Sequence, residues 1–533
     1  MSRSFRQSQS TLHTWSGLLL GWVLFLVFVS GTIAFWREGL NRYMRPELAR
    51  VEQPMQVLAG TQAYLATHAG DAKSWFITMP SERLPGAQAF WVPQPKEGAG
   101  GRGGHGRGRG RRDQVLIGAD GQPVQARETR GGEFFYRFHF DLFYMPVIWA
   151  RWLVGFASML MLVAILTGIV THKKIFRDFF TLRRQKGQRS WLDGHNASAV
   201  LALPFHLMIT YTGLVSLMAM LMPWATAANY SNEAKLFEAL FPQAEAVART
   251  GRPAPLVDLP TLARDAERRL GGPAGFISVS EPGDAAARVT VSRAPSSLLN
   301  TRSPGITYDG TTGAPVWRSP APGGAAATAG VMIGLHAGRF ADLLLRWIYF
   351  LCGIAGTLMV ASGLVLWVVK RRERLPDPRR PHLGFRIVER LNVAVIAGFP
   401  LGIACLFWAN RLLPVGMAER AQWEVHTLFL GWGAAALLAL VRRPANCWPA
   451  LLGATGGLLM LLPVFNLFAF RPGALAALAD GDLLPAGVDA TMLAIGAALI
   501  AVARRVARHD PPLRRPRSTP LPAESTPMLG VAR

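Results

Sequence analysis

The chain has 533 residues, of which 50% are hydrophobic, a formal net charge of +24 and three cysteines. Its apolar residues gather into runs of about 20, the length that spans a bilayer, which excludes an ordinary soluble globular protein. The basic residues cluster beside these runs, so the positive charge indicates membrane topology and anionic lipid rather than a nucleic-acid partner.

Eight candidate membrane spans follow one another along the chain, and the last four are rich in Ala, Leu and Gly. They are predicted at residues 14–36, 147–171, 197–222, 343–369, 391–413, 424–441, 447–468 and 484–506. Basic clusters such as 171–189 and 504–517 all fall on one side if the chain crosses eight times. The positive-inside rule then predicts a multi-pass protein with both termini in the cytoplasm. The first span is too long for the core of a cleaved signal peptide, so we expect an uncleaved anchor.

The predicted fold class is a mainly α-helical, polytopic membrane protein with two outer α+β segments. Its parts are an N-terminal tail with the first span (1–36), an outer α+β segment (37–146), the second and third spans with a cytoplasmic loop (147–222), a second outer α+β segment (223–342), the fourth span (343–375), a C-terminal four-helix membrane region (376–508) and a cytoplasmic disordered tail (509–533).

The second outer segment carries clear local signals. A helical pattern covers 259–272, and strand-like pieces follow at 276–280, 287–293 and 306–317, the last of them interrupted by the turn sequence YDGTTG. A similar piece, VLIGADGQPVQ, closes the first segment. That segment also contains GAGGRGGHGRGRGRRD (98–113), whose glycine spacing is similar to a nucleotide-binding loop. No strand precedes it and no helix follows, so a disordered basic loop is expected.

An internal repeat is the most informative feature of the sequence. HTWSGLLLGWVLFLVFVSGTI from His13 aligns without gaps with HNASAVLALPFHLMITYTGLV from His195. Ser30-Gly31 then matches Thr212-Gly213, and each glycine lies 18 residues after its histidine.

The helix that closes each unit repeats as well. RWLVGFASMLMLVAILTGIV from Arg151 aligns with RWIYFLCGIAGTLMVASGLV from Arg346, so that Thr167-Gly168 matches Ser362-Gly363. Upstream, His139 and His336 precede these arginines by 12 and 10 residues. The first four spans are therefore two copies of one unit, namely helix, outer α+β segment and helix. The small-residue pairs are expected to let helices pack closely.

Two-fold repetition brings equivalent residues towards a shared axis. We therefore predict that His13 faces His195 near the cytoplasmic surface, and that His139 faces His336 near the outer surface. Paired neutral imidazoles on facing helices suit the two axial positions of a haem iron, and a four-helix bundle supplies an apolar slot for the porphyrin. The pattern predicts haem bound at these two pairs.

Other interpretations of these histidines remain open. A single histidine at a helix end is often an interfacial residue or a cap. A divalent metal site is the next choice, although carboxylates are scarce nearby and Asp141 and Asp193 are the main candidates.

Three further histidines lie in or beside the spans. His206 is 11 residues after His195, which on a straight helix is about 16 Å along the axis and about 20° around it, on the same side. Its repeat counterpart is Leu24, so the repeat does not support it as a ligand. The roles left open for it are an intermediate ligand, a contact for a haem propionate and part of a proton path. His172 is an alternative ligand for the inner haem. His426 lies beside Glu424 and predicts a proton or quinone site, or a buried polar pair.

Several pieces of the sequence carry a family resemblance. They are LHTWSGLLLGW, FHFDLF, LTGIVTHKKIFRDFFTLR, the DGHN…TYTGL helix, LHAGRF and the hairpin sequence YDGTTGAPV. At these residues, and over about residues 8–375, the chain resembles the PepSY-associated transmembrane family, which includes iron-regulated membrane proteins and inner-membrane ferric-siderophore reductases.

The resemblance implies a bacterial inner-membrane bundle with two periplasmic PepSY-like domains and two haems b. It assigns haem iron to His13, His139, His195 and His336, with His172 and His206 as further candidate ligands. The last four spans depart from the shorter four-helix pattern of the family.

The resemblance also implies a transmembrane ferric-siderophore reductase, which passes electrons across the membrane to a periplasmic ferric siderophore. Fe(II) prefers softer and less charged ligand sets than such chelators offer, so one electron releases the metal. The sequence shows no nucleotide or flavin motif, so the expected electron donor is a cytoplasmic reductase or membrane quinol.

Two rival functions are compatible with the same spans. In a permease for a siderophore or an ion, the histidines would line a transport path, and Pro204, Pro400 and Pro463 would interrupt helices. In a non-enzymatic membrane sensor, the PepSY-like domains would bind another protein.

Overall fold

The structure is a computed structural model that describes residues 4–81, 84, 86–95, 114–171, 183, 187–377, 380–469, 474–479 and 481–508. The Gly/Arg-rich loop at 98–113, the tail at 509–533 and His172 lie outside the described residues. Within those ranges, six helices are long and apolar enough to cross a membrane, and two bent helix pairs raise the number to eight. This agrees with the predicted multi-pass architecture.

The spans follow the predicted order along the chain. They are α1 (Phe5–Leu19) with α2 (Gly21–Ala34), α6 (Val147–Thr171), α8 (Gln188–Leu201) with α9 (Leu203–Ser216), α15 (Leu343–Arg372), α16 (Leu383–Asn392) continued by a π-helical turn (Val393–Ala397) and α17 (Gly398–Leu412), α18 (Arg420–Val441), α19 (Pro444–Ala469) and α21 (Leu483–Ala507). The last turn of α15 contains Lys370, Arg371 and Arg372, which complement the negative end of the helix dipole.

Two spans that the sequence predicts as single helices are bent. The first pair, α1 and α2, meets at 65°, and the second pair, α8 and α9, meets at 68°. The breaks fall at Leu20 and Ala202, which are equivalent positions of the repeat. Pro204 lies in the first turn of α9, where a proline begins a helix well but cannot continue the preceding one. In the first unit, Gly21 begins α2 and lies close to the Leu364 side chain of α15.

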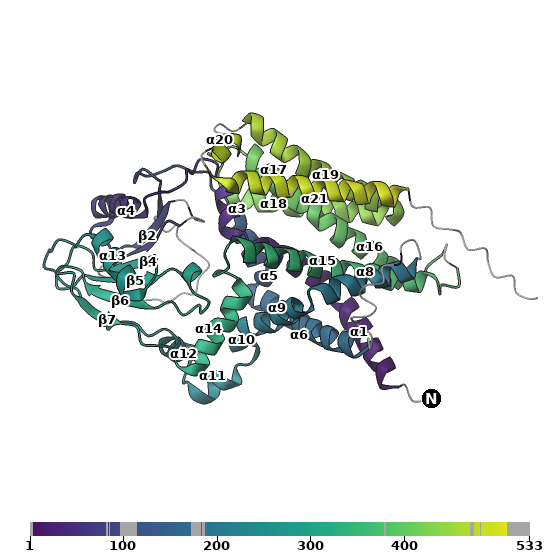
Figure 1. The fold of residues 1–533 in the computed structure, drawn as a ribbon, viewed down its shortest axis with the longest axis horizontal. Helices are drawn as coiled ribbons and strands as arrows, with labels where there is room; N and C mark the ends of the chain where they lie inside the picture. The colour runs from purple at the N-terminus through teal and green to yellow at the C-terminus, as the bar shows by residue number, and fades with distance from the viewer. Residues whose placement is uncertain are drawn as a thin grey trace, which may run out of the picture.

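The bends make the two repeats cross each other. In each unit the first half-helix packs on the second helix of its own unit, so α1 contacts α6 and α8 contacts α15. The second half-helix crosses to the other unit, so α2 contacts α15 and α9 contacts α6. We call the end of this bundle next to the sheet the sheet end, and the opposite end, where α1 and α8 begin, the distal end (Figure 1).

Both outer segments contribute to one seven-stranded antiparallel sheet, with strand order β3-β2-β1-β4-β5-β6-β7. The first segment supplies β1 (Ser74–Thr78), β2 (Ala87–Val92) and β3 (Gln114–Ile117), and the second supplies β4 (Ala274–Ser280), β5 (Arg288–Arg293), β6 (Gly305–Asp309) and β7 (Pro315–Arg318). The segments join where β1 pairs with β4, for example Phe76 opposite Ser278. The sequence predicts two separate α+β units, whereas the structure has a shared sheet.

One face of the sheet is covered by two helices at equivalent places in the repeat, α4 (Pro54–Ala69) and α13 (Leu259–Leu270). Their apolar sides pack on alternate strand residues such as Ile77, Ile277 and Val291, which are fully buried. The predicted helix at 259–272 and the strands of the second segment are confirmed. The sequence reading missed α4, β1 and β2 of the first segment.

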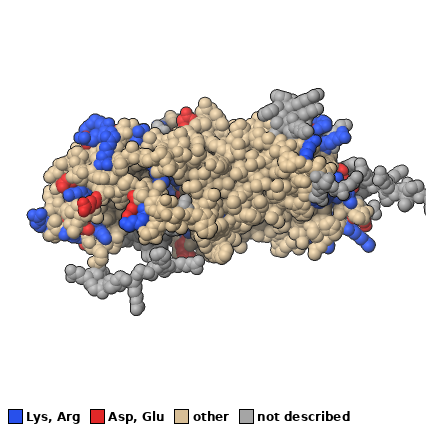
Figure 2. All heavy atoms as spheres, turned by 90° about the horizontal axis from the view of Figure 1, so that it is seen from below, with Lys and Arg blue, Asp and Glu red and all other residues tan. Residues whose placement is uncertain are grey.

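Short helices link the sheet to the bundle. These are α3 (Arg37–Tyr43), α5 (Gly131–Asp141), α10 (Met218–Leu221), α11 (Trp224–Asn229), α12 (Glu233–Leu240) and α14 (Gly324–Ala337), and α20 (Ala474–Ala479) lies before α21. The helices from α16 to α21, here called the C-terminal helix region, lie along one side of the bundle (Figure 1). Charged side chains gather at the two ends of the molecule and leave an uncharged band between them, as a membrane-spanning region requires (Figure 2).

Candidate functional site

The first predicted histidine pair meets at the distal end of the bundle. His13 on α1 and His195 on α8 have ring centroids 6.2 Å apart, with ring planes at 71°. Nδ1 of His13 is 2.8 Å from the carbonyl oxygen of Ala164, and Nδ1 of His195 is 2.9 Å from that of Met359. Both carbonyls belong to the second helix of the same unit, so each ring is oriented by its own repeat.

The second predicted pair meets at the sheet end. His139 is in the last turn of α5 and His336 in the last turn of α14, with centroids again 6.2 Å apart and planes at 26°. Their Nδ1 atoms lie 2.6 Å and 3.0 Å from the carbonyl oxygens of Tyr136 and Ile209. Burial lowers the pKa of both imidazoles to about 4, so both rings are neutral at pH 7.

The repeated Ser/Thr-Gly pairs have a more specific role than the helix packing that the sequence predicts. Each glycine faces one histidine ring: Gly168 faces His13, Gly363 faces His195, Gly213 faces His336 and Gly31 faces His139. A Cβ atom at Gly213 would come within 2.9 Å of the His336 ring, and one at Gly363 within 3.1 Å of the His195 ring. The glycines therefore leave room for the imidazoles between the helices.

The geometry of both pairs fits a shared iron atom. Metal–nitrogen bonds of about 2 Å on either side of one metal place two imidazole centroids about 6 Å apart. In all four histidines Nδ1 can donate its proton to a backbone carbonyl, which leaves Nε2 as the ligating nitrogen. Metal-bound histidines commonly donate their other N–H in this way. The residues present thus fit bis-histidine haem ligation.

A cavity of about 360 Å³ adjoins the distal pair. Its walls are mainly apolar and come from both repeats, with Leu24, Met161 and Met359 among the lining residues. Arg6, Lys370 and Arg371 also line it. An apolar slot with cations at one margin matches an amphipathic macrocycle that carries carboxylates on one edge. The sequence analysis attributed the basic clusters to membrane topology and anionic lipid, so it did not single out these cations as cavity residues.

His206 lines the same cavity as the distal pair and is fully buried. Neither of its ring nitrogens has a hydrogen bond of good geometry among the described residues, and the backbone of Ala199 and Cys352 lies nearest to them. Its ring lies 6.1 Å from that of Phe28, edge to face. The straight-helix geometry predicted for His195 and His206 is wrong, because the chain bends by 68° between them. Both side chains nevertheless line one cavity.

Glu424 and His426 do not form a polar pair with each other. The Glu424 carboxylate accepts hydrogen bonds from Asn410, Thr129 and Arg420. His426 instead stacks on Tyr144, with the ring planes at 4°, and shares a hydrogen bond with its hydroxyl group. The two neighbouring residues of α18 therefore belong to different surroundings.

The carboxylates considered for a divalent metal are paired with arginines. Asp141 binds Arg151 at 2.8 Å, and Asp193 binds Arg183 at 2.7 Å. A search of the described ranges found no group of three or more His, Cys, Asp or Glu side chains that could hold a metal ion.

Comparison with known proteins places this site in a broader context. A family model for the PepSY-associated TM region matches residues 10–370, which include both repeats, the sheet and all four paired histidines. An uncharacterized protein of Pseudomonas aeruginosa is 30% identical over 388 residues, or 69% of this chain and 94% of that protein. The C-terminal helix region lies beyond the part matched by the family model.

Proposed function

This chain belongs to the family of PepSY-associated transmembrane regions, and we propose that it is a b-type haem protein of the bacterial inner membrane that passes electrons across the membrane to a periplasmic ferric siderophore. The observation that carries the proposal is the occurrence of two facing histidine pairs at equivalent places in the repeat, both with centroids 6.2 Å apart. Bound haem would supply reversible one-electron transfer at each pair.

The protein residues have defined roles in this proposal. His13 and His195 would hold one haem iron, and His139 and His336 would hold the other, each through Nε2. The backbone carbonyls of Ala164 and Met359 keep the distal rings in the ligating tautomer. Arg6, Lys370 and Arg371 bind the haem carboxylates at the margin of the distal cavity.

The two ends of the bundle have separate roles in the reaction. Haem held by the distal pair would take electrons from a cytoplasmic reductase or from membrane quinol, and the sheet-end pair lies next to the outer domain, where the ferric siderophore would bind. The substrate iron gains one electron, and the resulting Fe(II) leaves the chelate because hard oxygen ligands hold it less tightly. The basic distal end is then the cytoplasmic side, with both termini there.

The visible spectrum of the detergent-purified protein tests haem binding directly. We expect sharp reduced bands of low-spin haem b, and pyridine haemochrome analysis that gives about two haems per chain. His13→Ala and His336→Ala should each remove about one haem. The control is His68→Ala, because His68 is an exposed residue of α4 in the sheet domain.

Reduction in proteoliposomes then tests the direction of electron transfer. A reductant enclosed with the distal end should reduce an external ferric hydroxamate, reported by an Fe(II)-trapping dye. Absence of haem after expression with ample iron and haem precursor would contradict the proposal.

One observation supports a permease as the second candidate. Transporters often use broken helices at corresponding positions of two repeats to form a central binding site. The bends at Leu20 and Ala202 are such a pair, at 65° and 68°. Uptake of a radiolabelled ferric siderophore into proteoliposomes, by haem-free protein, would favour the permease over the reductase.

A further inference from the structure

The C-terminal helix region has no role in the function proposed above and lies beyond the family match. We propose that it braces α5, the helix that carries His139, and that Glu424, Arg420 and Asn410 are the positioning residues of this brace. The proposal that the C-terminal helix region holds α5 in place is supported by the contacts described below and does not depend on haem binding. The consequence for a haem ligand rests on the proposed function.

The first contact is an aromatic face of α5. Phe135 and Phe138 are buried against the C-terminal helix region, where Phe135 lies 6.1 Å from Phe407 and Phe138 lies 5.6 Å from Phe399. The next residue, His139, points to its partner in the bundle. Helix α5 is therefore held between the C-terminal helix region and the bundle.

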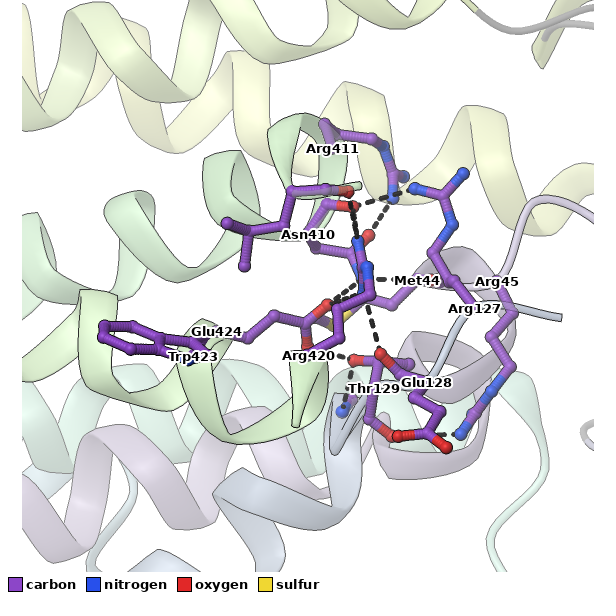
Figure 3. Close-up of polar contacts among 12 residues, drawn as sticks. Met44, Arg45, Arg127, Glu128, Thr129, Asn410, Arg411, Arg420, Trp423 and Glu424 are labelled. Carbon is purple, nitrogen blue, oxygen red and sulfur yellow. Dashed lines mark hydrogen bonds and ion pairs between the residues drawn. The ribbon is translucent and has the colours of Figure 1, made fainter. Parts of the chain in front are cut away.

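The second contact is a buried polar cluster at the start of α5 (Figure 3). The Thr129 hydroxyl group donates to the Glu424 carboxylate and accepts a hydrogen bond of 2.9 Å from the backbone N–H of Gly131, the first residue of α5. Asn410 donates to the same carboxylate at 2.7 Å, and Arg420 forms an ion pair with it. Glu424 and Arg420 are 1% and 0% exposed, so water does not compete with these bonds.

The third contact fixes the backbone that leads into α5. Arg420 donates to the carbonyl oxygen of Glu128 at 2.8 Å and to that of Asn410 at 2.6 Å. Arg127 donates to the same Asn410 oxygen at 2.8 Å. Residues from both sides thus meet at one carbonyl, which ties segment 127–129 to the end of α17.

On its other side the start of α5 has no room to move. Gly131 has φ +50°, and a Cβ atom there would come within 2.4 Å of the side-chain oxygen of Asn41 in α3. A Cβ atom at Gly132 would overlap the carbonyl group of Arg37. The start of α5 is therefore confined between α3 and the C-terminal helix region, and the position of His139 at its other end follows.

The repeat supplies an internal comparison. Helix α14, which carries His336, packs on α9 of its own unit. The glycines Gly330 and Gly334 of α14 lie against Asn300 and Leu299 of the outer segment. The brace therefore acts on one ligand of the sheet-end pair and not on the other.

Hydrogen–deuterium exchange of the full chain in detergent tests the brace without reference to haem. Glu424→Gln removes the charge that Arg420 and Thr129 bind, and Thr129→Val removes the link to α5 while it leaves the Arg420–Glu424 pair in place. We expect both variants to speed exchange in 131–141 by about tenfold, because local opening becomes easier. Exchange in 324–337 should stay unchanged. The control is Glu389→Gln, which removes an acid of the same region that pairs with Arg372.

Redox titration and electron paramagnetic resonance of the same variants test the consequence for the ligand. In Thr129→Val we expect a changed g-value pattern and midpoint potential for the sheet-end haem, with those of the distal haem unchanged. Unchanged exchange in 131–141 in both variants would overturn the brace. Faster exchange with unaltered haem signals would overturn its positioning role. Faster exchange in a protein that contains no haem would leave the brace standing and refute the proposed function.

Discussion

At the scale of single residues, His206 departs most from ordinary packing. A buried polar group without a hydrogen bond costs about 1–3 kcal/mol, and neither nitrogen of this imidazole has a hydrogen bond of good geometry among the described residues, where the backbone of Ala199 and Cys352 lies nearest. The equivalent position in the first repeat is Leu24, which lines the same cavity. Retention of an imidazole where the repeat has leucine points to contact with a molecule bound in the cavity.

We expect His206→Leu to retain bis-histidine ligation at both pairs, because the ligands proposed above are the other four histidines, whose rings face each other in two pairs. The thermal stability of the haem-free protein should stay equal or rise, since an unpartnered polar group is replaced by an apolar one. The distal haem potential should shift. Leu24→Ile is the matched control at the equivalent position. Conversion of one haem to a high-spin, five-coordinate spectrum would instead identify His206 as a ligand.

The sequence was sufficient to pair the four histidines, because register across a repeat carries over directly to a two-fold arrangement. The sequence could not predict that Nδ1 of each ring contacts a backbone carbonyl oxygen. Every residue has a backbone carbonyl group, so the residue type does not show which one accepts a hydrogen bond. The role of Gly213 and Gly363 was hidden for a related reason. A glycine that faces an imidazole and one that faces another helix have the same sequence pattern.

At the scale of secondary-structure elements, the turn between β6 and β7 depends on one carboxylate. Asp309 accepts hydrogen bonds from the backbone N–H groups of Thr311 and Thr312, both at 3.0 Å, and from Arg288 at 2.8 Å. Burial raises the pKa of Asp309, but the hydrogen bonds from the two threonines outweigh it and hold the pKa at about 2. The turn is therefore stabilised by the ionised form.

Because the folded pKa is below the unfolded value of about 3.9, this stabilisation is complete above pH 4 and is lost as the pH falls towards 2. We expect Asp309→Asn to lower the stability of the sheet at pH 7 by about 1–3 kcal/mol, and to weaken its dependence on pH between 4 and 2. Urea unfolding at several pH values, monitored by hydrogen–deuterium exchange of the backbone amides in residues 288–318, measures both effects. Asp71→Asn, at an exposed position of the same domain, is the control. Equal midpoints for wild type and Asp309→Asn at pH 7 would contradict the prediction.

The elements that the sequence missed share a physical cause. Strand β1 is five residues long and pairs with β4, about 200 residues further along the chain, so no local turn marks it. The bend at Leu20 has no proline, and it requires the close approach of α15 to Gly21. By contrast, α13 and the β6–β7 turn were predicted because a helical residue pattern and the turn sequence YDGTTG are local signals.

At the scale of the whole molecule, the two repeats contact each other both in the membrane and in the outer sheet. In the membrane α2 and α9 cross to the opposite unit, and outside it β1 and β4 pair in one sheet. Each join buries surface from both repeats, so the relative position of the units is fixed by packing as well as by the chain connection.

The shared sheet can be tested by a disulfide between the repeats. Ser74 on β1 lies directly opposite Ser280 on β4, a register that places Cβ atoms about 4.5–5.5 Å apart. We expect the double variant Ser74→Cys with Ser280→Cys to form a disulfide on mild oxidation, detected by mass spectrometry of linked peptides. The off-register pair Ser74→Cys with Ser278→Cys should link far more slowly. Equal rates for the two pairs would contradict a continuous sheet.

The crossed arrangement has a consequence for what a single unit can be. One helix–segment–helix unit supplies one imidazole to each pair, one wall of the distal cavity and one half of the sheet. A single unit on its own would therefore contain only half of each histidine pair and of the cavity. The edge of β1 that pairs with β4 would be exposed, and each of the unit's two histidines would lack its partner. It becomes complete only by pairing with a second copy about a two-fold axis, through an isologous interface. Residues 5–372 therefore correspond to the two subunits of a two-fold dimer joined in one polypeptide.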